Sequence, residues 1–227
     1  MAPKGRGAVW EAVVREAAQD VDPRWTVTGR GTRTVLTWDR IGWVWQSVGV
    51  DLKSGNAHDL YASRAWLDMP FRRSITATAQ DLLPAPSPDQ SFWLERDGAV
   101  EQLRRWAALV PGEVFTNTLQ QDLEELEWHL DLFLTENARL PWMPLAGMRV
   151  VFGRDPRPVI DAALEWLSDP AGSGRPGPDD PDLAYWNEFR ARLEEGREAT
   201  LRWLDEFRRN TLRAARVPDD LVVPVLD

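Results

Sequence analysis

Alternation of bulky apolar side chains on both faces of a segment is strongest in residues 41–52. One alternating set holds Ile41, Trp43 and Trp45, and the other holds Val44, Val48, Val50 and Leu52. A strand that is apolar on both faces is typical of a central strand covered on two sides. We therefore expect the rest of the chain to be organised around this segment.

The flanking sequence predicts an antiparallel meander. Residues 34–38 and 58–67 have extended patterns, with a tight reversal expected at Asp39-Arg40 and a turn at Ser54-Gly55-Asn56. Residues 25–28 add a strand before this meander, and residues 73–80 predict a further strand with one solvated face. We expect a sheet of four or five strands.

Segments with helical periodicity come before and after the predicted strands in the chain. Residues 83–89 contain three prolines and separate a mainly strand half, 8–82, from a mainly helical half, 96–216. The expected helices span residues 8–19, 99–109, 116–137, 159–167 and 183–215, with a short strand at 148–152.

Four local features refine these expected elements. Pro111-Gly112 should end one helix, and Gly196 is a weak point in the last one. In the helix at 116–137, Trp128 and Leu132 form a second apolar strip, so we expect this helix to pack between two neighbours. Residues 169–182 have almost no apolar side chains and predict a mobile loop.

Together these patterns predict an α+β protein. We expect residues 1–227 to form a single compact domain, with the N-terminal helix on one side of the sheet and the C-terminal helices on the other.

Composition narrows the possible functions. The chain has 13 tryptophans against 2 tyrosines, a formal net charge of -9 and no cysteine. The missing cysteines exclude thiol catalysis, disulfides and cysteine-ligated zinc, and the negative charge repels nucleic acid at long range. The chain has no apolar run of the length that a signal peptide or a membrane span requires. We expect a cytoplasmic protein that does not bind membranes.

Acid–base chemistry has one candidate group, formed by Asp122, Glu125 and His129. At the helical angle of 100° per residue, these side chains cover an arc of about 60°, so a carboxylate could orient the imidazole. This group would suit a small-molecule hydrolase or transferase. The alternative, which we favour, is a solvated polar helix face. The chain contains no HExxH, Walker A or G-x-S-x-G motif, so we expect no metal and no cofactor.

A binding surface has a separate candidate set, formed by Trp43, Trp45, Arg64 and Trp66. If alternate positions on adjacent strands project from one face, they present indoles beside a guanidinium, and Trp and Arg are enriched at binding hot spots. The alternative is that helices cover this face and make the tryptophans part of the core.

Four arginines near the end of the chain, Arg208, Arg209, Arg213 and Arg216, could contact phosphate. The structural alternative, which we favour, is that these cations are stabilised by the negative end of the helix dipole. The overall charge supports the structural alternative, so nucleic acid is a disfavoured partner.

Residues 8–80 combine the order helix, hairpin and strand with Gln46-Ser47, Lys53-Ser54 and the extended run LYASRAWLD. In these features they resemble a bacterial family of domains of unknown function. The resemblance implies an N-terminal helix followed by a meander, and it assigns no site residues. The acidic, cysteine-free composition is similar to that of toxin-neutralising immunity proteins. Our hypothesis is a non-enzymatic protein-binding module with a protein partner.

Overall fold

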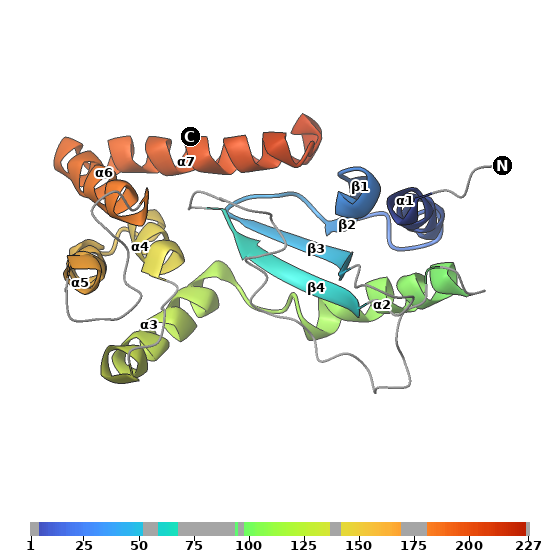
Figure 1. Cartoon of the computed structure of the whole chain (residues 1–227), viewed down its shortest axis with the longest axis horizontal. Coiled ribbons are helices and arrows are strands. Elements are labelled where there is room, and N and C mark those ends of the chain that lie inside the picture. The colour runs from blue at the N-terminus through green and yellow to red at the C-terminus, as the bar shows by residue number, and fades with distance from the viewer. Residues whose placement is uncertain are drawn as a thin grey trace.

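The sheet lies at the centre of the molecule. The computed structural model describes residues 5–51, 59–67, 94, 98–136, 142–168 and 181–225. Within them, an antiparallel sheet has its strands in chain order (Figure 1). The strands are β1 (Trp25–Thr28), β2 (Val35–Trp38), β3 (Val44–Asp51) and β4 (Asp59–Trp66). The predicted α+β class and meander are confirmed, while the predicted strand at 73–80 and the proline-rich segment at 83–89 lie outside the described residues.

The connection between β2 and β3 is wider than the predicted two-residue turn. Thr37 is paired with Ser47, so the strands are joined by more than Asp39-Arg40. The central strand begins at Val44 because Ile41 pairs with another segment. The backbone N–H of Ile41 donates to the Leu221 carbonyl at 2.8 Å, and its own carbonyl accepts from the Val223 N–H at 3.0 Å. The C-terminal tail therefore pairs with the connection between β2 and β3.

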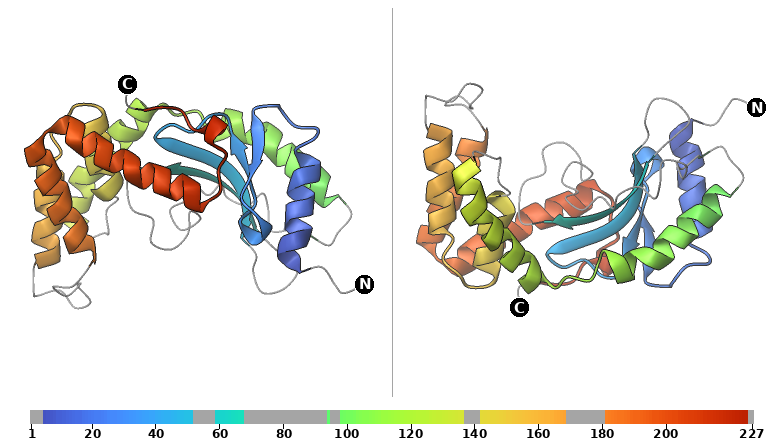
Figure 2. Two further views of the ribbon diagram at one scale, coloured as in Figure 1. Left: turned by 90° about the horizontal axis from the view of Figure 1, so that it is seen from above. Right: turned by 90° about the horizontal axis from the view of Figure 1, so that it is seen from below.

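Helices cover the two ends of the sheet. They are α1 (Arg6–Ala17), α2 (Ala99–Glu113), α3 (Leu119–Glu136), α4 (Trp142–Val151), α5 (Arg157–Ser168), α6 (Pro181–Glu195) and α7 (Arg197–Ala214). In Figure 1, α1 and α2 lie at one end, α3 to α6 lie at the other, and α7 runs from α6 back toward the sheet. Figure 2 shows the same arrangement from above and below. None of the described helices combines the length and the apolar content needed to cross a membrane.

The apolar core forms three clusters. The first packs α1 and α2 on the sheet face that carries Leu36, Val48 and Ala62. The second joins α3 to α7 and includes Trp43 and Trp66. The third lies on the opposite sheet face, where Trp45 packs against the end of α7. As predicted, α1 and α7 lie on different faces. The prediction that the C-terminal helices cover the face opposite α1 is wrong for α2 and α3, because α2 packs on the face of α1 and Asp122 of α3 is bound by Arg64 on that same face.

The helix α2 continues through Pro111, where we predicted its end. Proline has no N–H to donate, so the carbonyl four residues earlier loses its helical partner. That carbonyl belongs to Ala107, and it accepts the indole N–H of Trp25 at 3.1 Å. A tertiary hydrogen bond thus replaces the missing helical one.

Two further element predictions are wrong. The predicted strand at 148–152 falls largely within α4, whose residues 144–148 are all buried. A short run that is apolar on every side conceals its helical period. The predicted helix at 183–215 is two helices, which separate at Gly196, where φ is 109°. This break lets Tyr185 and Phe189 of α6 pack against Trp203 of α7, with 5.3 Å between ring centroids in each pair.

The predicted loop at 169–182 lies outside the described residues up to residue 180. Residues 181 and 182 belong to the first turn of α6.

Candidate functional site

The inner side of α3, which faces the sheet, contributes Asp122 to a buried ion pair with β4. The Nε of Arg64 on β4 donates to Oδ2 of Asp122 at 2.9 Å, and its Nη2 donates to the same oxygen at 2.5 Å. The side chains are 4% and 3% exposed. The sequence assigned these two residues to rival sites, and the structure brings them together. The Asp122 carboxylate is therefore already engaged as an acceptor inside the protein.

The predicted acid–base group is not assembled by the described side chains. Asp122 is buried against the sheet, whereas Glu125 is exposed on the same helix. The side chain of His129 lies outside the described residues. No group of three or more potential metal ligands occurs in the part of the chain that the structure describes. The hydrolase or transferase hypothesis stays a prediction, and no contact among the described residues favours it.

The tryptophan-rich binding set does not form an exposed surface. Trp43, Trp45, Arg64 and Trp66 are all buried. The register pairs Trp45 with Ala65 and Val44 with Trp66. Since cross-strand partners share a face, Trp45 points to the opposite side of the sheet from Arg64 and Trp66. The expectation of one shared face is wrong, because it required a register shifted by one residue.

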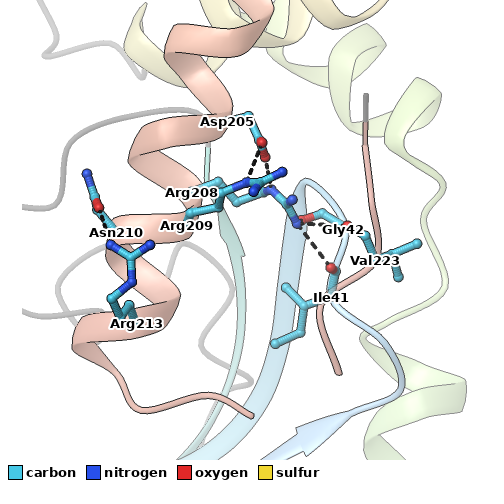
Figure 3. Close-up of polar contacts among 8 residues, drawn as sticks. All are labelled: Ile41, Gly42, Asp205, Arg208, Arg209, Asn210, Arg213 and Val223. Atoms are coloured by element: carbon cyan, nitrogen blue, oxygen red, sulfur yellow. Dashed lines mark hydrogen bonds and ion pairs between the residues drawn. The ribbon is translucent and has the colours of Figure 1, made fainter. Parts of the chain in front are cut away.

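Arg208 is a structural residue rather than a surface cation. Figure 3 shows its guanidinium between α7, the β2–β3 connection and the C-terminal tail. Its Nε donates to Asp205 at 2.7 Å, and its Nη1 donates to three backbone carbonyls at 3.2 to 3.3 Å. Those carbonyls belong to Ile41, Gly42 and Val223. The side chain is 1% exposed, so Arg208 cannot contact a phosphate in this structure.

The other terminal arginines do not converge on one site. Arg209 is bound to Asp205 at 2.6 Å, and Arg213 donates to Asn210 at 2.9 Å. Arg216 follows the end of α7 with a positive φ of 59°. Because Arg208 is buried, fewer arginines lie at the surface in this region than the sequence indicated.

The outer face of α3, defined here as Gln121, Glu124, Glu125 and Trp128, carries a large exposed indole. Trp128 is 65% exposed, and the other three side chains are exposed as well. Helical geometry places residues three and four apart beside each other, so Glu124 and Glu125 flank Trp128 on the side toward the helix N-terminus. The result is an aromatic side chain bordered by carboxylates.

The acidic residues of α3 divide into two groups by their partners. On the inner side, Asp122 is bound by Arg64, and Glu127 is bound by Arg149 at 3.0 Å and also by Arg154. On the outer face, Glu124 accepts only the amide N–H of Gln120, at 2.7 Å, from the residues that the structure describes. Neither Glu124 nor Glu125 pairs with a lysine or arginine among the described side chains. The outer carboxylates keep their charge available for a partner.

From the sequence we expected Trp128 to pack against a neighbouring helix, and this prediction is wrong for its side chain. Leu123 and Leu126 supply the buried stripe of α3, and Trp128 lies on nearly the opposite side of the helix. The glutamates three and four residues earlier indicate a solvated side of the helix, but they do not exclude a buried strip, since buried Asp122 also lies three residues from exposed Glu125.

Comparisons with protein-family models, curated proteins and solved structures find no match for this chain. The resemblance of residues 8–80 to a bacterial family stays a prediction. We therefore infer a function from the outer face of α3 alone.

Proposed function

We propose that the protein is a non-enzymatic protein-binding module whose contact surface is the outer face of α3. One observation carries the proposal, namely the exposure of 65% of Trp128 between two glutamates. Tryptophan is enriched at the energetic centres of protein interfaces, where polar groups around it exclude water. The outer face has such a tryptophan, Trp128, with polar side chains around it.

The exposed indole is large enough to contribute substantially to binding. A tryptophan side chain buries about 150–250 Å² in an interface, so covering the exposed part of Trp128 stabilises a complex by about 2–4 kcal/mol. This matches the contribution of about 2 kcal/mol or more that defines a hot spot. The compositional resemblance to immunity proteins makes a protein toxin one candidate class of partner.

Leu109 provides a matched control for this surface. It is 62% exposed on α2, at the other end of the molecule. Neither side chain belongs to one of the three core clusters, so both variants should fold. A difference between them would therefore report on the surface rather than on stability.

The test compares wild type, Trp128→Ala and Leu109→Ala as immobilised bait in extracts of the native cell. We expect a stoichiometric partner on wild type and on Leu109→Ala, and an affinity at least about 30-fold weaker for Trp128→Ala. Equal retention by the Trp128 variant would refute the proposed surface. The absence of any stoichiometric partner would refute the protein-binding function.

A further inference from the structure

Residues 217–225 follow α7 and pair with the β2–β3 connection through backbone atoms. Val222 forms a parallel bridge with Ile41, and the N–H of Val223 donates to the Ile41 carbonyl at 3.0 Å. The Val223 carbonyl in turn accepts from Arg208 at 3.2 Å (Figure 3). Ile41 and Arg208 are 0% and 1% exposed, whereas none of residues 218–225 is buried. A site made of buried groups is thus filled by a segment that stays at the surface.

This pairing site recognises an extended backbone rather than particular side chains. Its bonds to Val223 use the N–H and the carbonyl of the main chain, and every residue except proline has both groups. A strand-accepting site of this kind can bind an extended segment from another molecule. Residues 217–225 themselves fit the site, so a second copy of the chain carries a suitable occupant.

The connection between α7 and this segment is strained at Arg216. Its φ is 59°, in the left-handed region, which a residue with a side chain disfavours by about five- to thirty-fold. Glycine usually occupies this position at a helix end, where the Val217 N–H donates back to the Leu212 carbonyl, here at 3.0 Å. Pro218 follows and favours an extended conformation of Val217. An extended Arg216 relieves the strain at the expense of the Val217–Leu212 hydrogen bond.

We infer that two copies of the chain exchange residues 217–225 through an extended hinge at Arg216 and so form a dimer. Val223 of each copy then pairs with Ile41 and Arg208 of the other copy. Because the monomer and the dimer share these contacts, they differ at the hinge and in the entropy of association. A short connection holds the segment at an effective concentration in the millimolar range, so the monomer predominates in dilute solution and the dimer forms as the protein is concentrated. The outer face of α3 takes no part in this exchange.

Sedimentation equilibrium of the full chain, between about 1 µM and 1 mM, tests the hinge. Arg216→Gly adopts a positive φ without strain, so the dimer dissociation constant should rise about 25-fold, which is five-fold for each of two hinges. Arg216→Val carries a β-branched side chain, which tolerates a positive φ even less well, so this variant should lower the constant. Arg216 is exposed, so neither change removes a core contact.

Two results of this measurement would overturn the exchange. One is the absence of a dimer from wild type up to about 1 mM. The other is an equal dissociation constant for wild type and Arg216→Gly, a comparison that does not require Arg216→Val to fold.

A change in the exchanged segment shows whether the dimer uses its backbone. Val223→Pro removes the N–H that donates to Ile41, so it should abolish the dimer of Arg216→Val while the far-UV circular dichroism stays that of wild type. Val225→Pro is the matched control, because the N–H of Val225 makes no hydrogen bond within the described residues, and it should leave the dimer in place. A dimer that persists in Arg216→Val/Val223→Pro would place the interface elsewhere and refute the exchange.

Cross-linking distinguishes an exchanged dimer from any other. The chain has no cysteine, and a Cβ at Gly42 meets no atom within 4 Å, so Gly42→Cys and Pro224→Cys provide two single-cysteine proteins. When they are mixed at high concentration and treated with a short bismaleimide, we expect a covalent dimer that contains one copy of each. A sedimenting dimer that gives no mixed covalent product would refute the exchange. The proposed surface on α3 is tested separately, because none of these variants changes it.

Discussion

Two arginines are buried where helices meet the sheet, and they are held in different ways. Arg64, 4% exposed, has one acceptor among the described residues, the Oδ2 atom of Asp122. Arg208, 1% exposed, is bound by Asp205 and by three backbone carbonyls. A buried charge is costly unless its hydrogen bonds are satisfied. The first arginine depends on a single carboxylate, whereas the second distributes its donors over three segments of the chain.

The largest expected effect is the loss of the one partner that the described residues give to Arg64. Asp122→Ala leaves a guanidinium buried between α3 and the sheet with no counter-charge from the described residues, which should lower the free energy of unfolding by about 3–5 kcal/mol. Urea unfolding at neutral pH measures this loss. The double variant Arg64→Met/Asp122→Leu removes both charges and should recover most of the stability. A loss below about 1 kcal/mol for Asp122→Ala would show that water reaches Arg64.

A smaller effect is expected for the carboxylate that binds Arg208. Asp205→Ala also removes the partner of Arg209, but the three carbonyl acceptors of Arg208 remain, so we expect a loss of about 2–3 kcal/mol. The neighbouring exposed residue supplies the control, since Glu206→Ala should change stability by less than about 0.5 kcal/mol. If Asp205→Ala proved more damaging than Asp122→Ala, the number of remaining acceptors would not be the deciding factor.

The smallest effect concerns an exposed pair and appears only in acid. The Arg24 guanidinium, followed by the Arg24 backbone N–H, lowers the pKa of Asp22 from 3.8 to about 2. A carboxyl whose pKa is lower in the folded state stabilises the fold above its ordinary pKa, and this contribution is lost as the pH falls through its folded value. Between pH 4 and pH 2, wild type should therefore lose slightly more stability than Asp22→Asn. Solvent screening keeps the difference small, and parallel acid-unfolding curves for the two proteins would contradict it.

The contrast between buried and exposed charges on α3 supports the functional argument as well. Asp122 and Glu127 are bound by arginines of the same chain, so their role is to fix the position of the helix. Glu124 and Glu125 lie on the outer face, where they add little to stability. The same helix is therefore anchored by one set of carboxylates, while another set stays at the surface.

Local patterns in the sequence were sufficient for the order of strands and for most helices. The alternation in residues 41–52 predicted β3, although β3 begins at Val44 and Ile41 pairs with the C-terminal tail. Periodicity also predicted α1, α3 and α5 within a few residues of their observed ends. These signals are local, because a helix or strand repeats its solvent exposure along its own length.

The site could not be predicted in the same way, because it depends on contacts between distant segments. Arg64 and Asp122 are 58 residues apart, and Arg208 meets Gly42 across 166 residues. No periodicity relates such pairs. A register change of one residue would have placed Trp45 on the face of Arg64.

The sequence alone determined the α+β class, the meander and the absence of thiol chemistry, since these follow from local hydrophobic periods and from composition. The tertiary structure decided which charges are buried and which remain at the surface. It placed Arg208 in the interior, continued α2 through Pro111 by means of the Trp25 indole, and left Trp128 exposed. The physical reason is that a side chain is buried only when another element covers it, and the covering element comes from elsewhere in the chain.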